Sequence, residues 1–240
     1  MGSALLRRRG GGLSARQQLA KYARDCKTFP GDAALAYRRG GVRDVWEELA
    51  RRTLHRLVQV GRCVVFAQPL DRLPEIPPPE GVSISLLNEA GCDALVPLVS
   101  QRELDRFRAR LANGRHCFVA WRGTRPIGYA WVADRVAPDV TIVPLLLPLD
   151  AAYLWDLYVL PAERCNGSGS ALASARCQLA RARGFREGWR MIAPSNHASI
   201  RTLVRSGPGA RVVGEMRYIK LISRMYVRFT PSSILAELAG

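Results

Sequence analysis

Glycine, serine and asparagine are gathered in one short segment, which reads Arg164-Cys165-Asn166-Gly167-Ser168-Gly169-Ser170. It follows an apolar stretch that ends at Pro161, and an alanine- and leucine-rich stretch comes directly after it. Glycine lets the backbone turn so that several N–H groups converge on one anion, and the amino end of a helix adds partial positive charge. The segment is therefore typical of a phosphate-binding turn, in which Arg164 would add a full positive charge. A plain helix cap is the alternative that the glycines alone leave open.

The stretches around this turn predict a strand–helix–strand unit. Apolar patterning indicates a strand over residues 153–160, a helix over 169–183 that Gly184 closes, and a strand over 189–193. The strands of such a unit are parallel and joined by a right-handed crossover. Ligands bind where neighbouring strands diverge at their carboxyl ends, and here that end is Val159-Leu160-Pro161.

The rest of the second part of the chain predicts an α/β (α+β) fold with one central sheet. Further strands are expected at 82–87, 116–121, 127–133, 211–221 and 224–229, and helices at 90–100, 103–111 and 198–205. Only the unit described above is plainly strand–helix–strand. We therefore expect a mixed, mostly antiparallel sheet with one parallel junction, flanked by helices.

A proline-rich stretch at 69–79 suggests a division of the chain near residue 80. Residues 1–80 are expected to form a basic N-terminal extension, and residues 81–240 the main domain. The extension would hold a weak helical pattern at 14–23, an amphipathic helix at 42–58 and a short strand at 63–67. It is too small to fold alone.

Composition excludes several classes of protein. The 240 residues are 48% apolar, which is too high for general disorder, and no run of 18 apolar residues could form a membrane span. The first residues lack the pattern of a secretory signal, and the six cysteines show no metal-ligand spacing, so we expect a cytoplasmic protein with reduced thiols and no metal site.

The net charge of +16 is uneven along the chain, because the first sixty residues hold thirteen basic and five acidic residues. A basic arm can bind nucleic acid, an anionic membrane or an acidic partner. No aromatic-interleaved patch or nucleic-acid motif accompanies it, so no specific nucleic-acid partner is expected.

Two segments together resemble the signatures of the GCN5-related N-acetyltransferases (GNAT). The first runs from Asp156 to Gly169, in which Val159-Leu160-Pro161 matches the family's Val-x-Pro and Arg164, Gly167 and Gly169 match its Arg-x-x-Gly-x-Gly. The second runs from Asn196 to Gly207 and looks like the family's Asn followed by a helix that ends at Gly. The resemblance covers about residues 80–230 and implies the GNAT fold, with a splayed parallel strand junction.

The resemblance also implies a co-substrate, acetyl-CoA or another acyl-CoA, and the residues that hold it. Its pantetheine amides would bind the main chain of Leu157 and Val159, and Asn196 would touch the same arm. Its pyrophosphate would lie in the turn formed by Arg164, Cys165, Asn166, Gly167, Ser168, Gly169 and Ser170. The implied reaction is direct acyl transfer to an amine in a ternary complex, with a main-chain N–H stabilising the oxyanion.

The acid–base groups depart from the family's pattern. The place of the family's usual tyrosine acid is taken here by Leu203, which cannot donate a proton. Tyr158 and Tyr218 are the candidates to replace that tyrosine as the proton donor to the leaving thiolate. The amine must lose a proton, and Asp156, beside the expected thioester, is the best candidate for the base. A structural role for Asp156, as the partner of an arginine or an N–H group, is the alternative.

The acceptor is less constrained by the sequence. Few carboxylates lie near the expected cleft, which favours an amine of a peptide or protein over a polyamine or aminoglycoside. The apolar, proline-interrupted insert at 136–149 would either line a pocket for a longer acyl chain or an apolar acceptor, or pack as an extended strand. A non-catalytic acyl-CoA sensor and a small-molecule amine acetyltransferase remain as alternatives, and a homodimer stays open.

Overall fold

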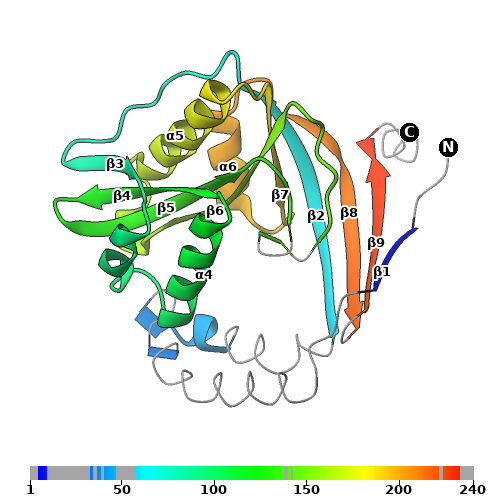
Figure 1. Ribbon diagram of the computed structural model, residues 1–240, viewed down its shortest axis with the longest axis horizontal. Coiled ribbons are helices and arrows are strands. Elements are labelled where there is room, and N and C mark those ends of the chain that lie inside the picture. The colour runs from blue at the N-terminus through cyan, green and yellow to red at the C-terminus, as the bar shows by residue number, and fades with distance from the viewer. Residues whose placement is uncertain are drawn as a thin grey trace. The chain divides into compact units, whose positions relative to one another are not determined.

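The computed structural model describes residues 5–9, 33–34, 37–38, 41–46, 58–137, 140–141, 143–221 and 224–232 of the chain (Figure 1). The chain divides into two compact units, which we call the small and the large unit. The small unit comprises Met1–Arg62 and Met216–Thr230, and the large unit comprises Cys63–Glu215 and Pro231–Gly240. The predicted division at residue 80 stays a prediction.

The elements occur in the following order along the chain: β1 (Leu5–Arg9), β2 (Val58–Pro69), β3 (Val82–Leu86), η1 (Ala90–Leu95), α4 (Gln101–Ala112), β4 (His116–Arg122), β5 (Arg125–Ala133), β6 (Ala151–Val159), η2 (Pro161–Glu163), α5 (Ser168–Ala182), β7 (Glu187–Ile192), α6 (His197–Ser206), β8 (Arg211–Leu221) and β9 (Arg224–Pro231).

The sheet of the large unit confirms the predicted fold class. Its strands lie in the order β2–β7–β6–β5–β4–β3, and every pair is antiparallel except β6 and β7, which run parallel. Helix α5 joins these two parallel strands, as the strand–helix–strand pattern predicts. The sheet is thus mixed and mostly antiparallel, with a single parallel junction.

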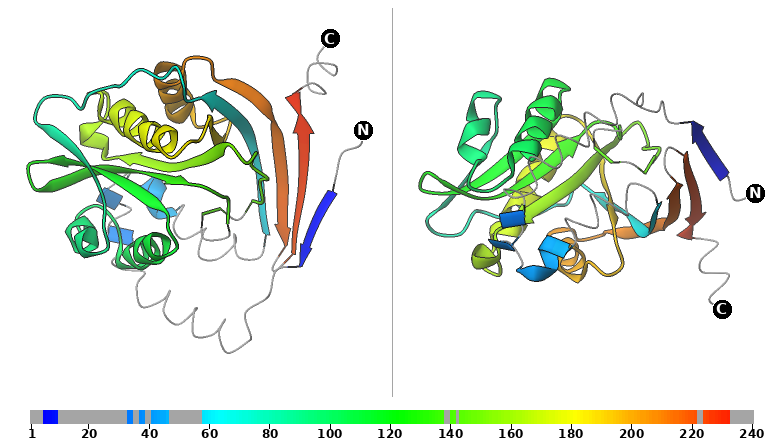
Figure 2. Two further views of the ribbon diagram at one scale, coloured as in Figure 1. Left: turned by 45° about the horizontal axis from the view of Figure 1, so that its top comes forward. Right: turned by 90° about the horizontal axis from the view of Figure 1, so that it is seen from below.

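Helices cover both faces of this sheet, with α4 on one face and α5 and α6 on the other (Figure 2). Successive side chains of the central strand β5 point alternately to the α4 face and to the α5 face of the sheet. Tyr129 and Trp131 meet the edge of Phe107 from α4, with ring centroids 5.0 and 4.8 Å apart. The next residue, Val132, packs with Cys177 of α5 in the opposite core layer. This alternation explains why β5 is buried on both sides.

One expected helix is shorter than its pattern suggests. The apolar residues at 90–100 predicted a helix, but the structure has a 3₁₀ helix only at Ala90–Leu95, followed by a turn. Pro97 has no backbone N–H to donate, so a regular helix cannot continue through this point. At the start of the 3₁₀ helix, the Gly91 N–H donates to both the side-chain oxygen and the carbonyl oxygen of Asn88, at 2.8 and 3.2 Å.

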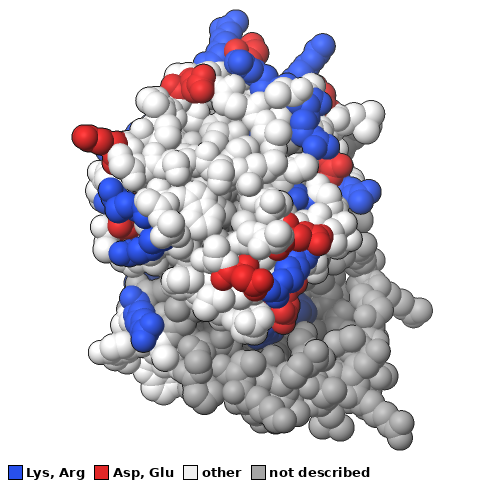
Figure 3. All heavy atoms as spheres, turned by 60° about the vertical axis from the view of Figure 1, so that its left-hand side comes forward, with Lys and Arg blue, Asp and Glu red and all other residues white. Residues whose placement is uncertain are grey.

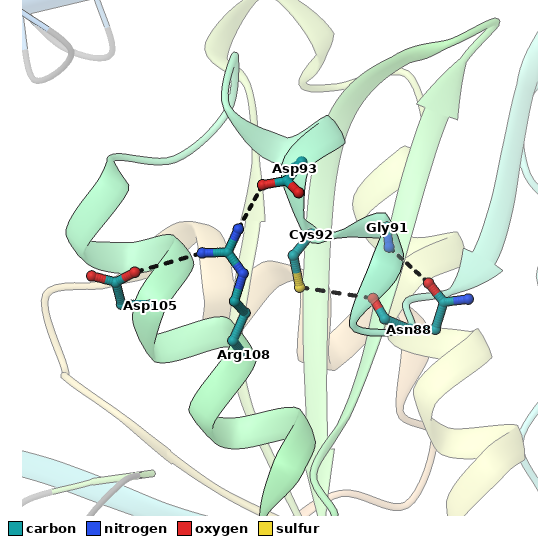
Figure 4. A network of polar contacts seen from close by, with 6 residues as sticks. All are labelled: Asn88, Gly91, Cys92, Asp93, Asp105 and Arg108. Atoms are coloured by element: carbon teal, nitrogen blue, oxygen red, sulfur yellow. Dashed lines mark hydrogen bonds and ion pairs between the residues drawn. The ribbon is translucent and has the colours of Figure 1, made fainter.

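Polar contacts fix α4 beside η1 (Figure 4). Arg108 of α4 donates to Asp93 of η1 and forms an ion pair with Asp105 one helical turn away. The Cys92 thiol lies 3.7 Å from the Asn88 carbonyl and donates to it. The contact between Arg108 and Asp93 holds α4 against η1. Phe107 and Arg110 of α4 point toward the sheet, where they contact aromatic rings of β5.

Ser100→Ala is expected to lower the free energy of unfolding by about 1 kcal/mol. The Ser100 hydroxyl accepts the Glu103 N–H at 3.3 Å, and the Glu103 carboxylate accepts the Ser100 N–H at 3.2 Å, so the variant breaks a reciprocal cap. Urea unfolding measures the change. Thr124→Ala, in an exposed hairpin turn, is the control and should leave stability unchanged; equal stabilities for both variants would contradict the role of this cap.

The small unit contains β1 and parts of β9, β8 and β2, which lie in the strand order β1–β9–β8–β2, with β1 and β9 antiparallel. The predicted final pair of strands, β8 and β9, is confirmed, whereas β1 was not predicted. Residues 42–46 are helical within the helix predicted for 42–58. Val58, the last residue of that predicted helix, begins strand β2 instead, whereas residues 47–57 and the helical pattern at 14–23 lie outside the described residues.

Candidate active site

Strands β6 and β7 pair over only part of their length. Their parallel register runs from Ala151 opposite Glu187 to Tyr153 opposite Trp189, and it stops there. Beyond this point β6 continues to Val159 and stays paired with β5, while β7 continues to Ile192 and stays paired with β2. The two strands therefore part toward their carboxyl ends, as the resemblance implied, and we call the space between them the strand gap.

The edge of β6 that borders the strand gap carries main-chain groups without a partner strand. The Leu160 N–H donates to the Ile127 carbonyl of β5 at 2.9 Å. Because alternate residues of a strand direct their main-chain groups to opposite sides, those of Val159 and Leu157 point away from β5, into the gap. This places the two predicted pantetheine-binding residues on the edge that could receive an extended ligand.

The turn after β6 adopts the backbone that its glycines predicted. Gly167 is the N-cap of α5 with φ +96°, and Cys165 also has a positive φ of 64°. The Asn166 side chain accepts the Ser168 N–H at 3.0 Å, and the first helical bond joins the Ala171 N–H to the Gly167 carbonyl. The N–H groups of Gly169 and Ser170 therefore have no acceptor within the helix and point out of its amino end.

Two further features of this turn bear on anion binding. The Ser168 hydroxyl is buried and has no hydrogen-bond partner among the described residues, so a ligand oxygen would satisfy it. Arg164 lies back over the strand end: its Nε donates to the Val159 carbonyl at 3.0 Å, and its guanidinium is 5.9 Å from the Tyr158 ring centre. The residues present fit a coenzyme A pyrophosphate, with Arg164 positioned at the mouth of the strand gap.

Asp156 stands at a bulge in β6. The register between β5 and β6 shifts between Tyr129 and Trp131, and Asp156, which has φ +47°, lies at the shift. Its carboxylate is 3.0 Å from Nη1 of Arg110, and the Tyr129 hydroxyl donates to it at 3.4 Å. A non-glycine residue in this backbone region is strained, and such strain concentrates at functional sites.

The electrostatic setting of Asp156 suits a base. Burial raises the pKa of the Asp156 carboxyl above its ordinary value, while the charge and hydrogen bond of Arg110 act to lower it. Although 37% of the Asp156 side chain is exposed, protein atoms surround the carboxyl closely enough for burial to dominate. A carboxylate whose pKa is raised is a stronger base than an ordinary aspartate, and solvent still reaches this one.

The other predicted residues are placed as follows. The Tyr158 ring lies 5.7 Å from the Tyr129 ring, in the same aromatic layer. Asn196 is the N-cap of α6, and its side chain accepts the Ser199 N–H at 3.1 Å. Leu203 is 2% exposed in the core, and Tyr218 lies in the small unit.

Arg110 and Tyr129 are site residues that the sequence reasoning missed. The guanidinium of Arg110 lies 5.2 Å from the Trp131 ring centre and reaches Asp156 from α4. Its position three residues after Phe107, on the apolar face of α4, was the available signal: an arginine in an apolar stripe needs a partner. Tyr129 gave no such signal, because a tyrosine in a buried strand is ordinary.

The described residues show neither a metal site nor a membrane-spanning helix. They contain no group of three His, Cys, Asp or Glu side chains that could hold a metal ion. Within the same residues, no helix is both long enough and apolar enough to span a membrane.

The sheet of the large unit thus has two parallel strands that part beside a helix start with a glycine N-cap. The sequence matches the acetyltransferase (GNAT) family over residues 85–207, which is more than half of its length, so the chain belongs to this family. A search of curated proteins found no match.

The chain is also similar to several solved structures. They include a Drosophila protein (TM-score 0.49, 16% identity, 78% of this chain and 57% of that one), a GNAT-family acetyltransferase from Novosphingobium aromaticivorans (0.44, 16%, 71% and 64%) and a GCN5-related N-acetyltransferase from Sphaerobacter thermophilus (0.45, 17%, 80% and 57%). This chain thus spans less than two thirds of each.

Proposed function

We propose that this protein transfers an acyl group from a coenzyme A thioester to an amine by direct attack in a ternary complex. The observation that carries the proposal is the strand gap, whose open end adjoins the free N–H groups at the start of α5. An extended thioester fits such a place, because its diphosphate and its amide-bearing arm need different partners. The turn before α5 offers N–H groups for the diphosphate, and the edge of β6 offers main-chain groups for the amides of the arm.

Each predicted co-substrate residue has a task in this proposal. The main chain of Leu157 and Val159 binds the amides of the arm, and Asn196 borders the arm from the start of α6. The turn formed by Arg164, Cys165, Asn166, Gly167, Ser168, Gly169 and Ser170 binds the pyrophosphate. The Leu157 N–H, next to the bulge, stabilises the oxyanion that forms when the amine attacks.

Asp156 serves as the base in this proposal. It accepts a proton from the acceptor ammonium, directly or through water, and Arg110 and Tyr129 hold its carboxylate in place. Tyr158 is the candidate acid for the leaving thiolate, on the same strand. The fixed geometry supplies most of the rate, since positioning replaces an encounter between separate molecules.

For the acceptor, we propose an amine of a peptide or protein, and for the location the cytoplasm, where thiols stay reduced. The five described cysteines are all free, which supports this location. On the face drawn in Figure 3, basic side chains stand beside acidic ones around an uncharged centre, which gives no support to a nucleic-acid partner.

The apolar insert bears on the acyl chain and the acceptor. Val140, Val143 and Leu145 are buried, whereas Leu146 and Leu149 are exposed, and the described residues of the insert form no strand. The extended strand therefore finds no support among them. The exposed pair fits an apolar acceptor better than a buried pocket for a long acyl chain.

Calorimetry with coenzyme A, followed by assays with acetyl-CoA, tests the proposed function. We expect micromolar binding of coenzyme A and acylation of a peptide amine, detected by mass spectrometry, in a panel that also holds a polyamine and an aminoglycoside. Absence of coenzyme A binding would refute the proposal. Binding without turnover on any amine would favour the acyl-CoA sensor, and turnover on the small amines alone would favour the small-molecule enzyme.

A further inference from the structure

Two arginines are buried where β6 and β7 begin to part. Arg176 lies on the inner face of α5 and is 3% exposed, and Arg190 lies on β7 and is 4% exposed. Arg190 is the first residue of β7 beyond the last pair with β6, at Trp189. Arg176 donates from Nη1 to the Trp155 carbonyl at 3.0 Å, two residues beyond the last paired residue of β6.

The guanidinium groups of Arg176 and Arg190 lack a carboxylate partner in the part of the chain that the structure describes. Among the described residues, no Asp or Glu oxygen forms an ion pair with either one, and the Nε atoms of both are buried without a hydrogen-bond partner. Arg190 donates to the neutral side chain of Gln68 and contacts the Cys177 thiol. Buried charges in proteins are ordinarily paired, because removing an ion from water without compensation costs several kcal/mol.

The two charges also oppose each other. Burial lowers the pKa of Arg176 to about 9, with the charge of Arg190 acting in the same direction. The closed end of the strand gap is therefore rich in positive charge and unpaired donors, while the adjacent Asp156 carboxylate is engaged by Arg110. An anion that entered the gap would satisfy both arginines.

In the proposed function, such an anion would be part of the acyl group that is transferred. The reacting carbonyl lies by Asp156 and Leu157, and Trp155, whose carbonyl Arg176 contacts, is the next residue toward the closed end of the gap. The far end of an acyl group therefore approaches Arg176. An apolar acyl tail would bury these charges further, whereas a carboxylate would pair with them.

We propose that Arg176 and Arg190 bind the free carboxylate of a dicarboxylic acyl group, so that the preferred donor is a dicarboxylic monothioester of coenzyme A. The inference rests on the proposed function and names its donor class. No new bond is required at the arginines: the acyl carbonyl is transferred to the amine, the thiolate leaves, and the distal carboxylate stays bound to the two guanidinium groups throughout.

Two stable thioethers of coenzyme A test this preference without an acceptor. The carboxypropyl and butyl thioethers have equal chain length and differ only in a terminal carboxylate against a methyl group. We expect the carboxypropyl thioether to bind the full chain about tenfold more tightly in calorimetry, as a charge-assisted hydrogen bond implies. Equal affinities, or tighter binding of the butyl thioether, would overturn the inference.

Arg176→Met separates recognition from a structural role. Replacing a buried, unpaired charge by an apolar residue of similar size is compatible with folding. We expect the ratio of the two affinities to fall close to one in this variant and to stay unchanged in Arg181→Met, which removes an exposed arginine from the same helix. A purely structural arginine would weaken both thioethers equally.

The ratio of the two thioether affinities is measured in the wild-type protein, so the inference stays testable if Arg176→Met does not fold. The affinity for coenzyme A itself, measured beside the two thioethers, distinguishes failure of the proposed function from failure of the donor class. If coenzyme A does not bind, the proposed function fails and the donor class with it. If coenzyme A binds and the ratio is near one, only the donor class fails.

Discussion

Asp156→Asn is expected to lower kcat/KM for amine acylation by about 100-fold or more near neutral pH, the usual contribution of a positioned base. The asparagine keeps the size of the side chain. Its amide oxygen can still accept from Arg110 and its NH₂ group can donate to the Tyr129 hydroxyl oxygen, but it cannot take a proton. The acceptor found in the amine panel provides the assay, and calorimetry with coenzyme A should show unchanged donor binding.

The pH dependence of this loss gives a sharper test. In the wild type, the rate should rise with pH as Asp156 ionises. The midpoint of this rise should lie at a higher pH than the ordinary pKa of an aspartate, because burial raises the pKa of the Asp156 carboxyl. The variant should lack this rise. Its deficit should then shrink toward pH ~10, where a primary amine loses its proton unaided.

Asp150→Asn is the matched control, because Asp150 is exposed and lies just before the opposite end of β6. This control should keep the wild-type profile. A wild-type rate in Asp156→Asn at every pH would show instead that Asp156 is only the structural partner of Arg110.

The sequence predicted those features of the site that depend on local signals. The strand–helix–strand unit, the turn at 164–170 and the helix start at Asn196 all follow from residues close together in the chain. The glycines of the turn predicted its backbone correctly, since Gly167 has the positive φ that only glycine adopts without strain. The divergence of β6 and β7 came from the resemblance, and their register confirms it.

The features that could not be predicted depend on contacts between distant residues. Arg110 and Tyr129 meet Asp156 from 46 and 27 positions away, and the bulge that turns Asp156 depends on the register of β5 against β6. Arg176 lies within the helix predicted for 169–183. Its position four residues after Leu172 and four before Ala180 places it on the apolar face of that helix. Only the structure shows that none of the described carboxylates pairs with it.

Gly169→Val is expected to weaken coenzyme A binding by about 100-fold or more while the fold persists. A Cβ atom at Gly169 would lie 3.7 Å from Val159 Cγ2 and 4.0 Å from Leu157 Cδ2, which are ordinary contact distances. In a helix valine is slightly more favourable than glycine, so α5 should form as before. The added methyl groups would nevertheless stand between the start of α5 and the edge of β6. Calorimetry measures the affinity, and thermal unfolding checks the fold.

Three further variants decide what such a loss means. Ala182→Val places the same side chain at the exposed end of α5 and should bind coenzyme A normally. Gly167→Ala has no atom within 4 Å of the new Cβ, so a loss there would come from the turn's backbone, strained by about 1–2 kcal/mol at φ +96°. Gly167→Asn should lose less, because asparagine tolerates this conformation. Full affinity in both Gly169→Val and Gly167→Ala would mean that the diphosphate binds elsewhere, since no ligand held by these amides could remain indifferent to both changes.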